Sequence, residues 1–250
     1  MAGQEAGDVL LVNGLRKNSL GIRCLQSIKT GTLASYSHVA LCLGSGDIVH
    51  SNMASGVHRV FIDDLLSECE PEWVAIRNPQ LPDKSAMKII NMASFYQRQS
   101  YNKNLKGILS GIPPNESSFC SQLVARILDN IGINVGVIPG KALPVHFQKL
   151  HNISWNDVTK DHKDFVKLLS DNPDIKEDMK EEFNFLLSLA MESQQSLAQS
   201  IDTYHALNTF LKNHHELSSK IGIESEAFQK LPYNKIPLEF WNIKQPKASE

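Results

Sequence analysis

Two short apolar segments joined by a glycine-rich turn give the first constraint on the fold. Residues 39–43 are all apolar, a Gly-Ser-Gly-Asp turn occupies residues 44–47, and a second apolar segment begins at Ile48 and ends at His50. Apolar runs of this length separated by glycines are typical of a β-hairpin. Because a hairpin brings the outer ends of its two strands together, we expect His38 and His50 to be neighbours.

The segment after residue 116 has the period of a helix. Apolar residues recur at helical spacing up to Gly132, which is a plausible helix end. We expect Ser117 or Ser118 to cap the first turn of this helix. Cys120 then lies in that turn, where free backbone N–H groups and the helix dipole should lower the pKa of its thiol. The apolar stripe is formed by Leu123, Val124, Ile127, Leu128 and Ile131.

A thiol at a helix start and two imidazoles on a hairpin are the groups that a cysteine acyl-transfer enzyme requires. Taken alone, Cys120 could equally be a small buried hydrophobic residue, which is how we interpret Cys24, Cys42 and Cys69. A single strand histidine is more often a half-exposed polar residue than a catalytic one. The two histidines together favour the catalytic interpretation.

The order of these features, with the histidine hairpin before the cysteine helix, resembles that of the permuted papain-fold amidases. These form the YiiX/YaeF-like branch of the NlpC superfamily, with lecithin:retinol acyltransferase as a more distant relative. The resemblance is carried by residues 7–12, 36–50, 56–65 and 119–124, and by motif order it extends over roughly residues 7 to 157. It implies an α+β fold: a circularly permuted papain-like (NlpC-type) core with an antiparallel sheet and a nucleophile helix, followed here by a helical C-terminal extension.

The resemblance also implies roles for individual residues. Cys120 corresponds to the nucleophile, His38 to its base and His50 to the third polar position. Many YiiX-like sequences carry glutamate at that third position, whereas the acyltransferase branch and the unpermuted NlpC peptidases carry histidine. Tyr101 resembles a tyrosine that helps to bind the oxyanion, although it could also be an ordinary half-buried aromatic residue. Ser121, next to the nucleophile, is the other candidate for the oxyanion or substrate site.

The expected function is therefore thiol-dependent hydrolysis of an amide or ester bond through an acyl-enzyme on Cys120. One alternative is acyl transfer to a lipid or amine acceptor, which uses the same chemistry with water excluded. A second alternative is a binding or adaptor protein that retains the fold without the activity. Relatives with this core act on peptidoglycan stem peptides, lipids or protein amides, and the sequence does not select among them.

Composition excludes several other classes of function. The net charge of −2 and the lack of a basic stripe argue against nucleic-acid binding. There is no apolar run long enough to span a bilayer, and the first residues do not form a signal peptide. We therefore expect synthesis in the cytoplasm, with export by a signal-independent route as an alternative. The sequence contains neither His-Glu-x-x-His nor Cys-x-x-Cys spacing and no dinucleotide-binding loop, so we expect no metal and no cofactor.

A change of composition after Trp155 predicts two parts, a catalytic domain at residues 1–157 and a helical extension at residues 158–250. Within the first part, strands are expected at residues 8–12, 57–61 and 73–77, and helices at residues 84–97 and, less regularly, 15–29. The glycine- and proline-rich loop at residues 107–115 should shape a substrate cleft. The extension should contain a short helix at residues 161–169 and a long amphipathic helix from Asn172 to before Gly222. We interpret it as a cap over the core, with a lid or a protein-docking surface as the alternative.

Overall fold

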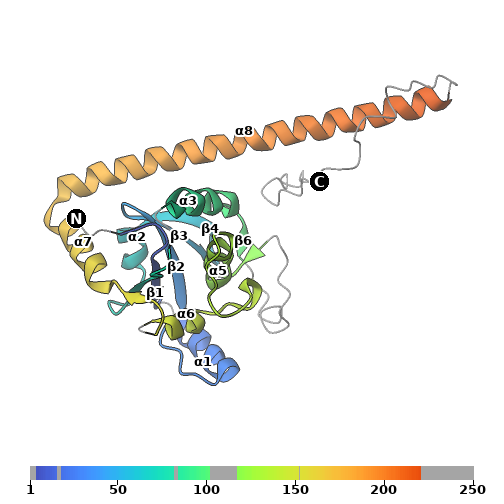
Figure 1. Cartoon of the computed structure of the whole chain (residues 1–250). Helices are drawn as coiled ribbons and strands as arrows, with labels where there is room; N and C mark the ends of the chain where they lie inside the picture. Colours follow the sequence, from blue (N-terminus) through green and yellow to red (C-terminus); the bar gives the residue numbers. More distant parts are fainter. Residues whose placement is uncertain (1–3, 16–17, 82–83, 102–116, 152, 221–250) are drawn as a thin grey trace. The chain divides into compact units, whose positions relative to one another are not determined.

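The computed structural model describes residues 4–15, 18–81, 84–101, 117–151 and 153–220, and Figure 1 shows how the elements are arranged. The chain divides into two compact units, Met1–Leu186 and Leu187–Glu250. The strands are β1 (Val9–Val12), β2 (His38–Gly44), β3 (Asp47–Asn52), β4 (Gly56–Phe61), β5 (Val74–Arg77), β6 (Ser100–Tyr101), β7 (Ser117–Ser118) and β8 (Asn156–Asp157). The helices are α1 (Asn18–Thr30), α2 (Ile62–Ser67), α3 (Ser85–Tyr96), α5 (Cys120–Asn130), the 3₁₀-helix η1 (Pro139–Lys141), α6 (Pro144–Leu150), α7 (Thr159–Asp171) and α8 (Pro173–Lys220).

A six-stranded antiparallel sheet, in the order β4-β3-β2-β1-β5-β8, forms the centre of the first unit. Its central strand β1 is fully buried, which explains why that strand contains only apolar residues. The apolar stripe of α5 packs in one core cluster with Val39 and Leu41 of β2, and α3 adds Ile89 and Ala93 to the same cluster. The predicted α+β class, with an antiparallel sheet and a helix that begins at the cysteine, is confirmed.

The β2–β3 hairpin is present as predicted, with Leu41 opposite Val49. Gly44 and Gly46 both adopt positive φ angles, 104° and 85°, which only glycine adopts without strain. A Cβ atom at Gly46 would also lie 2.5 Å from the ring of Phe61, so this position has no room for a side chain. The next hairpin, β3–β4, places His50 directly opposite His58.

The start of α5 differs from the prediction in one respect. Ser117 and Ser118 do not cap the helix; they form β7, which pairs in parallel with β6. The Ser118 hydroxyl group is hydrogen-bonded to the side chains of Gln99 and Arg126 and so cannot turn back to the helix. Instead the side-chain oxygen of Gln122 accepts a hydrogen bond of 3.1 Å from the backbone N–H of Phe119. Cys120 is still the first residue of the helix.

The first unit continues beyond the sheet into α7 and the beginning of α8. His162 of α7 is fully buried, and its Nε2 lies 2.8 Å from Oδ2 of Asp8, just before β1. Phe183 of α8 packs against Phe61, with 6.0 Å between ring centroids. The first compact unit therefore includes α7 and the part of α8 up to Leu186, which the sequence-based division assigns to the extension. No helix in the described part of the chain combines the length and the apolar character needed to cross a lipid bilayer.

Candidate active site

Three histidines on adjacent strands form a continuous row. Nε2 of His38 lies 3.0 Å from Nδ1 of His50, and Nε2 of His50 lies 3.0 Å from Nε2 of His58. The row ends at the backbone, because Nδ1 of His58 lies 3.0 Å from the carbonyl oxygen of Gly56. A carbonyl oxygen can only accept, so Nδ1 of His58 carries a proton and donates it. The proximity of His38 and His50 agrees with the hairpin argument.

Sequence analysis did not single out His58. Its position follows from the β3–β4 register, in which His50 and His58 are direct cross-strand partners. A signal for this was available: the two residues are equidistant from the turn that precedes Gly56, so a tight hairpin there would have paired them. The signal is weak, because the turn residues Met53, Ala54 and Ser55 form no strong hairpin motif.

Burial lowers the pKa of two histidines in the row. It lowers the pKa of His38 to about 4, with a further contribution from the nearby His58. Burial also holds the pKa of His50 well below its ordinary value, helped by His38 and His58. Both imidazoles are therefore neutral near pH 7, and each carries one proton that it can donate and one nitrogen that can accept.

A cavity of about 160 Å³ lies beside the row. His38 and His50 line it together with Tyr101, so the structure brings three of the candidate residues to one cavity. Ser19 and Ile22 of α1 form another part of the lining, and the remainder comes from Gly14, Ser37, β3, the β3–β4 turn, α2 and the two residues after α2. Those residues include Ser51, Asn52, Met53, Ala54, Leu65, Glu68 and Cys69.

Cys120 lies just behind this cavity. Its side chain is 1% exposed and belongs to an apolar cluster that also contains Phe119. Ile22 and Tyr101 pack against that cluster and also line the cavity, so these two side chains link the surroundings of the thiol to the cavity. Burial, together with the neighbouring Cys120, raises the pKa of Tyr101. The Tyr101 hydroxyl group therefore stays protonated and can donate a hydrogen bond. The other members of the cluster are Ala34, Leu143 and Val145.

The roles of nucleophile and base imply a hydrogen bond between Cys120 and His38, which is not formed between these described residues. Of the hydrogen bonds between described residues, none joins Cys120 Sγ to a ring nitrogen of His38. Val39 and Leu41 pack with α5, whereas His38 alternates with them along β2. Cys120 lies near the backbone of Val39, the residue after His38.

The expected low pKa of the Cys120 thiol is wrong for this structure. Burial raises its pKa to about 12. Backbone groups of Val39, Ser121 and Cys120, and the Ser121 side chain, lower the pKa but do not offset burial. The helix start provides the stabilisation that the sequence suggested, and the apolar cluster outweighs it. The resting pair is thus a neutral thiol and a neutral imidazole.

Comparison with known proteins assigns the chain to a family. A family model for permuted papain-like amidase enzymes of the YaeF/YiiX, C92 family matches residues 4–143. The chain belongs to this family. As a member of the permuted papain-like amidases, it belongs to a family of cysteine hydrolases. No curated protein matches the chain.

One solved structure that resembles this amidase is described as the metalloprotein YiiX from Escherichia coli O157:H7. It shares 18% sequence identity with the chain, with a TM-score of 0.42, and the match covers 53% of this chain and 69% of the YiiX chain. In the part of the amidase that the structure describes, no group of three or more histidine, cysteine, aspartate or glutamate residues is arranged to hold a metal ion.

The two oxyanion candidates occupy different positions in the amidase. Tyr101 lines the cavity, and its ring lies 5.6 Å from that of Phe119, the residue before the nucleophile candidate. Ser121 is fully buried and donates a 2.7 Å hydrogen bond to the carbonyl oxygen of Ala142. Ser121 therefore anchors α5 to the segment before α6, whereas Tyr101 is the candidate that borders open space.

Proposed function

We propose that this amidase hydrolyses an amide or ester bond through an acyl-enzyme on Cys120, with His38 as the base and His50 as the residue that orients it. The observation that carries this proposal is the row of hydrogen bonds from Gly56 to His38. Such a row fixes both the rotation and the tautomer of the imidazole at its end, which a catalytic base requires.

The order of protons along the row follows from its anchor. When each ring carries a single proton, the proton of His58 is the one donated to the Gly56 carbonyl, so Nε2 of His58 must accept a hydrogen bond from His50. His50 then has an unprotonated Nδ1, which accepts from Nε2–H of His38. This leaves Nδ1 of His38 with a free lone pair. His58 thus acts as a positioning residue that determines which nitrogen of His38 can accept a proton.

The reaction then proceeds in two halves. His38 Nδ1 takes the proton of the Cys120 thiol as Sγ bonds to the substrate carbonyl carbon, which gives a tetrahedral oxyanion. Backbone N–H groups at the start of α5 and the Tyr101 hydroxyl group are the donors available to stabilise that oxyanion. Its collapse breaks the bond to the leaving group, which takes the proton from His38. Water then attacks the thioester with His38 again as base, releasing the acid and restoring the thiol.

The cavity lining favours acyl transfer as a second candidate function. Ile22, Met53, Ala54 and Leu65 give part of the wall an apolar character suited to an acyl chain. An amine or alcohol acceptor in such a cavity would compete with water for the thioester. The nucleophile and base would be the same as for hydrolysis.

Trapping the acyl-enzyme tests the proposal. The full chain is mixed with p-nitrophenyl acetate or butyrate, quenched in acid and analysed by intact mass and peptide mapping, with and without hydroxylamine as acceptor. We expect one acyl group on Cys120 and no acylation of the Cys120→Ala variant. The matched control is Cys24→Ala, which should still be acylated on Cys120, because Cys24 is exposed on α1 and is not part of the site. Equal acylation and turnover in Cys120→Ala would contradict the proposal, and faster product formation with hydroxylamine would favour acyl transfer.

The pH dependence of activity gives a second test. His38 must be neutral to accept a proton, and since its pKa is lowered to about 4, its neutral fraction rises as the pH increases through that value. The thiol stays protonated across neutrality because burial raises its pKa to about 12. We therefore expect kcat/KM for p-nitrophenyl butyrate to rise between about pH 3.5 and 5 and to stay flat to about pH 8. An acid limb near pH 6–7 would instead indicate an imidazole with an ordinary pKa.

A further inference from the structure

Helix α1 has its apolar side turned outward. Ser19 and Gln26 face the protein interior, and the Gln26 side-chain oxygen accepts a 2.9 Å hydrogen bond from the backbone N–H of Val145. The opposite side exposes Leu20 by 61%, Leu25 by 51% and Ile28 by 81%. A surface helix normally shows the reverse pattern, which makes this exposed side a candidate for contact with a partner.

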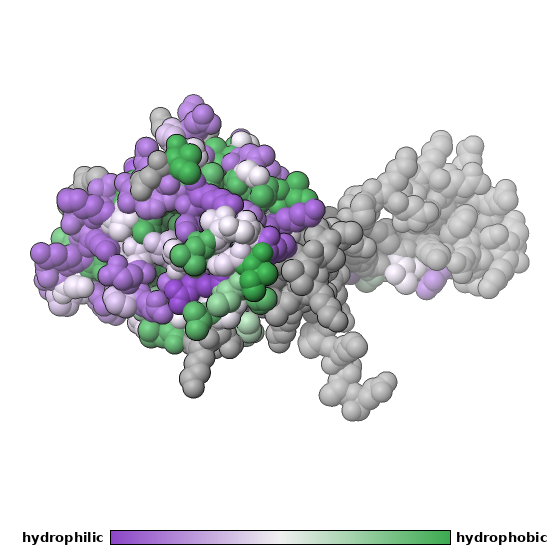
Figure 2. Space-filling model, turned by 90° about the horizontal axis from the view of Figure 1, so that it is seen from below, coloured by the Kyte–Doolittle hydropathy of each residue, from purple (hydrophilic) through white to green (hydrophobic). Residues whose placement is uncertain are grey.

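The exposed apolar side continues beyond the helix. Leu33, in the loop after α1, is 80% exposed, and Ile138, just before η1, is 60% exposed. A side-chain amide hydrogen bond connects the loop after α1 to α6: Gln148 of α6 donates to the carbonyl oxygen of Leu33 at 3.1 Å. We call the surface formed by Leu20, Leu25, Ile28, Leu33 and Ile138 the α1 surface. Figure 2, viewed from the end of the molecule at which α1 lies in Figure 1, shows apolar patches exposed between hydrophilic ones.

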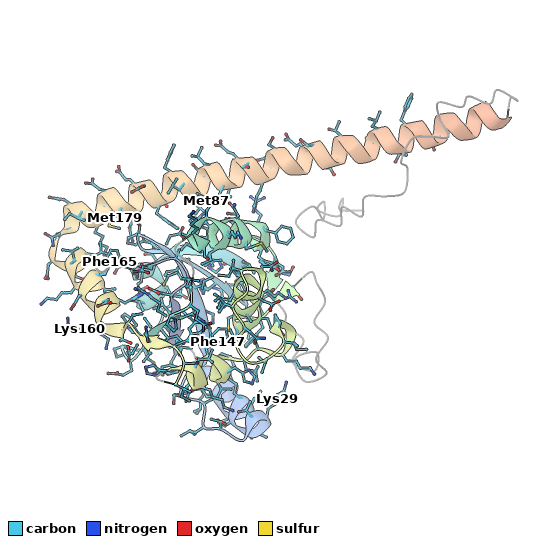
Figure 3. The ribbon with its side chains drawn as sticks, in the orientation of Figure 1. Lys29, Met87, Phe147, Lys160, Phe165 and Met179 are labelled. Atoms are coloured by element: carbon cyan, nitrogen blue, oxygen red, sulfur yellow. The ribbon has the colours of Figure 1, made fainter. Side chains whose placement is uncertain are left out.

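The segments that build the α1 surface carry charge of one sign. Residues 9–46 and 130–156, the two segments that build it, contain no aspartate or glutamate although the whole chain has a net charge of −2. Lys29, Lys141 and Lys149 are exposed there. Burial and then the charge of Lys141 lower the pKa of Lys29, so these two cations lie close enough to repel each other. Figure 3 shows Lys29 at the outer end of α1.

We propose that the α1 surface docks the amidase onto an anionic lipid bilayer. Leucine and isoleucine side chains on one helix face, flanked by lysines, match the boundary between acyl chains and negatively charged headgroups. A second copy of the chain is a poorer partner, because a two-fold interface would bring lysines of the same face against one another. Ser19 and Ile22, on the inner side of α1, line the active-site cavity, so docking would place that cavity at the membrane surface.

Vesicle co-sedimentation of the full chain tests this docking and needs no catalytic activity. The probes are phosphatidylcholine vesicles with 30% phosphatidylserine and vesicles of phosphatidylcholine alone. We expect binding to the anionic vesicles that weakens when the salt concentration rises, and little binding to the neutral ones. Ile28→Ser should weaken binding about tenfold through lost apolar contact, and Lys141→Gln about fivefold through the loss of one charge near the surface.

Matched controls come from α3, where Met87 is 65% exposed and the neighbouring Lys88 is exposed. Figure 3 shows Met87 at the end of the first unit opposite Lys29. Met87→Ser and Lys88→Gln should leave binding unchanged. The proposal would be overturned if the α3 variants lost vesicle binding to the same extent, or if the full chain did not bind anionic vesicles. Concentration-dependent dimerisation in size-exclusion chromatography that Ile28→Ser abolishes would assign the surface to a second copy of the chain instead.

Discussion

Replacing His38 with alanine is expected to lower kcat/KM for p-nitrophenyl butyrate by about 10²–10⁴-fold, the range typical of a lost general base. His58→Ala should cost less, about tenfold, because the ring orients the base through His50 and does not itself take the proton of the thiol. The loss of kcat/KM is therefore expected to be largest for His38→Ala, smaller for His50→Ala and smallest for His58→Ala. Steady-state assays of the three variants, with circular dichroism to confirm folding, measure it.

A spectroscopic readout separates the orienting role of His58 from a general loss of packing. The ¹⁵N shifts of histidine rings distinguish Nδ1–H from Nε2–H tautomers. In the wild-type protein we expect His38 to carry its proton on Nε2, and in His58→Ala a mixture of both tautomers. His151→Ala is the matched control, since His151 pairs with Asp157 outside the row. An unchanged His38 tautomer in His58→Ala would show that the row does not determine it.

Replacing Asp8 with alanine is expected to lower the free energy of unfolding by about 3–5 kcal/mol, the cost of breaking a buried ion pair from one side. Asp8 is fully buried and accepts two hydrogen bonds from Arg77, of 2.7 and 2.8 Å, and one from His162 of 2.8 Å. Without the carboxylate, Arg77 and His162 lose their shared partner. Urea unfolding followed by circular dichroism measures the change.

The same carboxylate gives the stability a defined pH dependence. Burial alone would raise the pKa of Asp8, but hydrogen bonds from Arg77, His162 and the Glu5 backbone outweigh it and lower the pKa. The stabilisation is thus fully present above the unfolded-state value of about 3.9 and is lost as the pH falls below it. Asp164→Asn, which breaks an exposed pair with Lys160, should lower stability far less than Asp8→Ala, because solvent screens that pair. A similar loss in both variants would contradict the role assigned to Asp8.

The sheet and the histidine pair could be predicted because their signals are local. Apolar strands separated by glycines indicate a hairpin, and a hairpin alone places His38 near His50. The same is true of α5, whose stripe covers one face of the sheet. The short elements α2, α6 and β8 could not be predicted, because a few residues of helix or strand depend on tertiary partners such as the pairing of Ile76 with Asp157.

The prediction about the thiol failed for a physical reason. A helix start is visible in the sequence, but the burial that opposes it comes from residues far apart in the chain, such as Ala34 and Val145. The capping prediction failed in a similar way, since Gln99 and Arg126 engage the Ser118 hydroxyl group from outside the local segment. Sequence patterns located the chemical groups, whereas their electrostatic environment depends on the assembled fold.

The burial of Cys120 has a consequence for oxidative damage. Peroxides react with exposed thiolates, and Cys120 is neither exposed nor deprotonated at rest. Cys24, exposed on α1, meets an oxidant first and would form a sulfenic acid or a mixed disulfide there. In the proposed mechanism the Cys120 thiol becomes reactive only when it meets His38, and on that proposal it is protected from irreversible oxidation between turnovers.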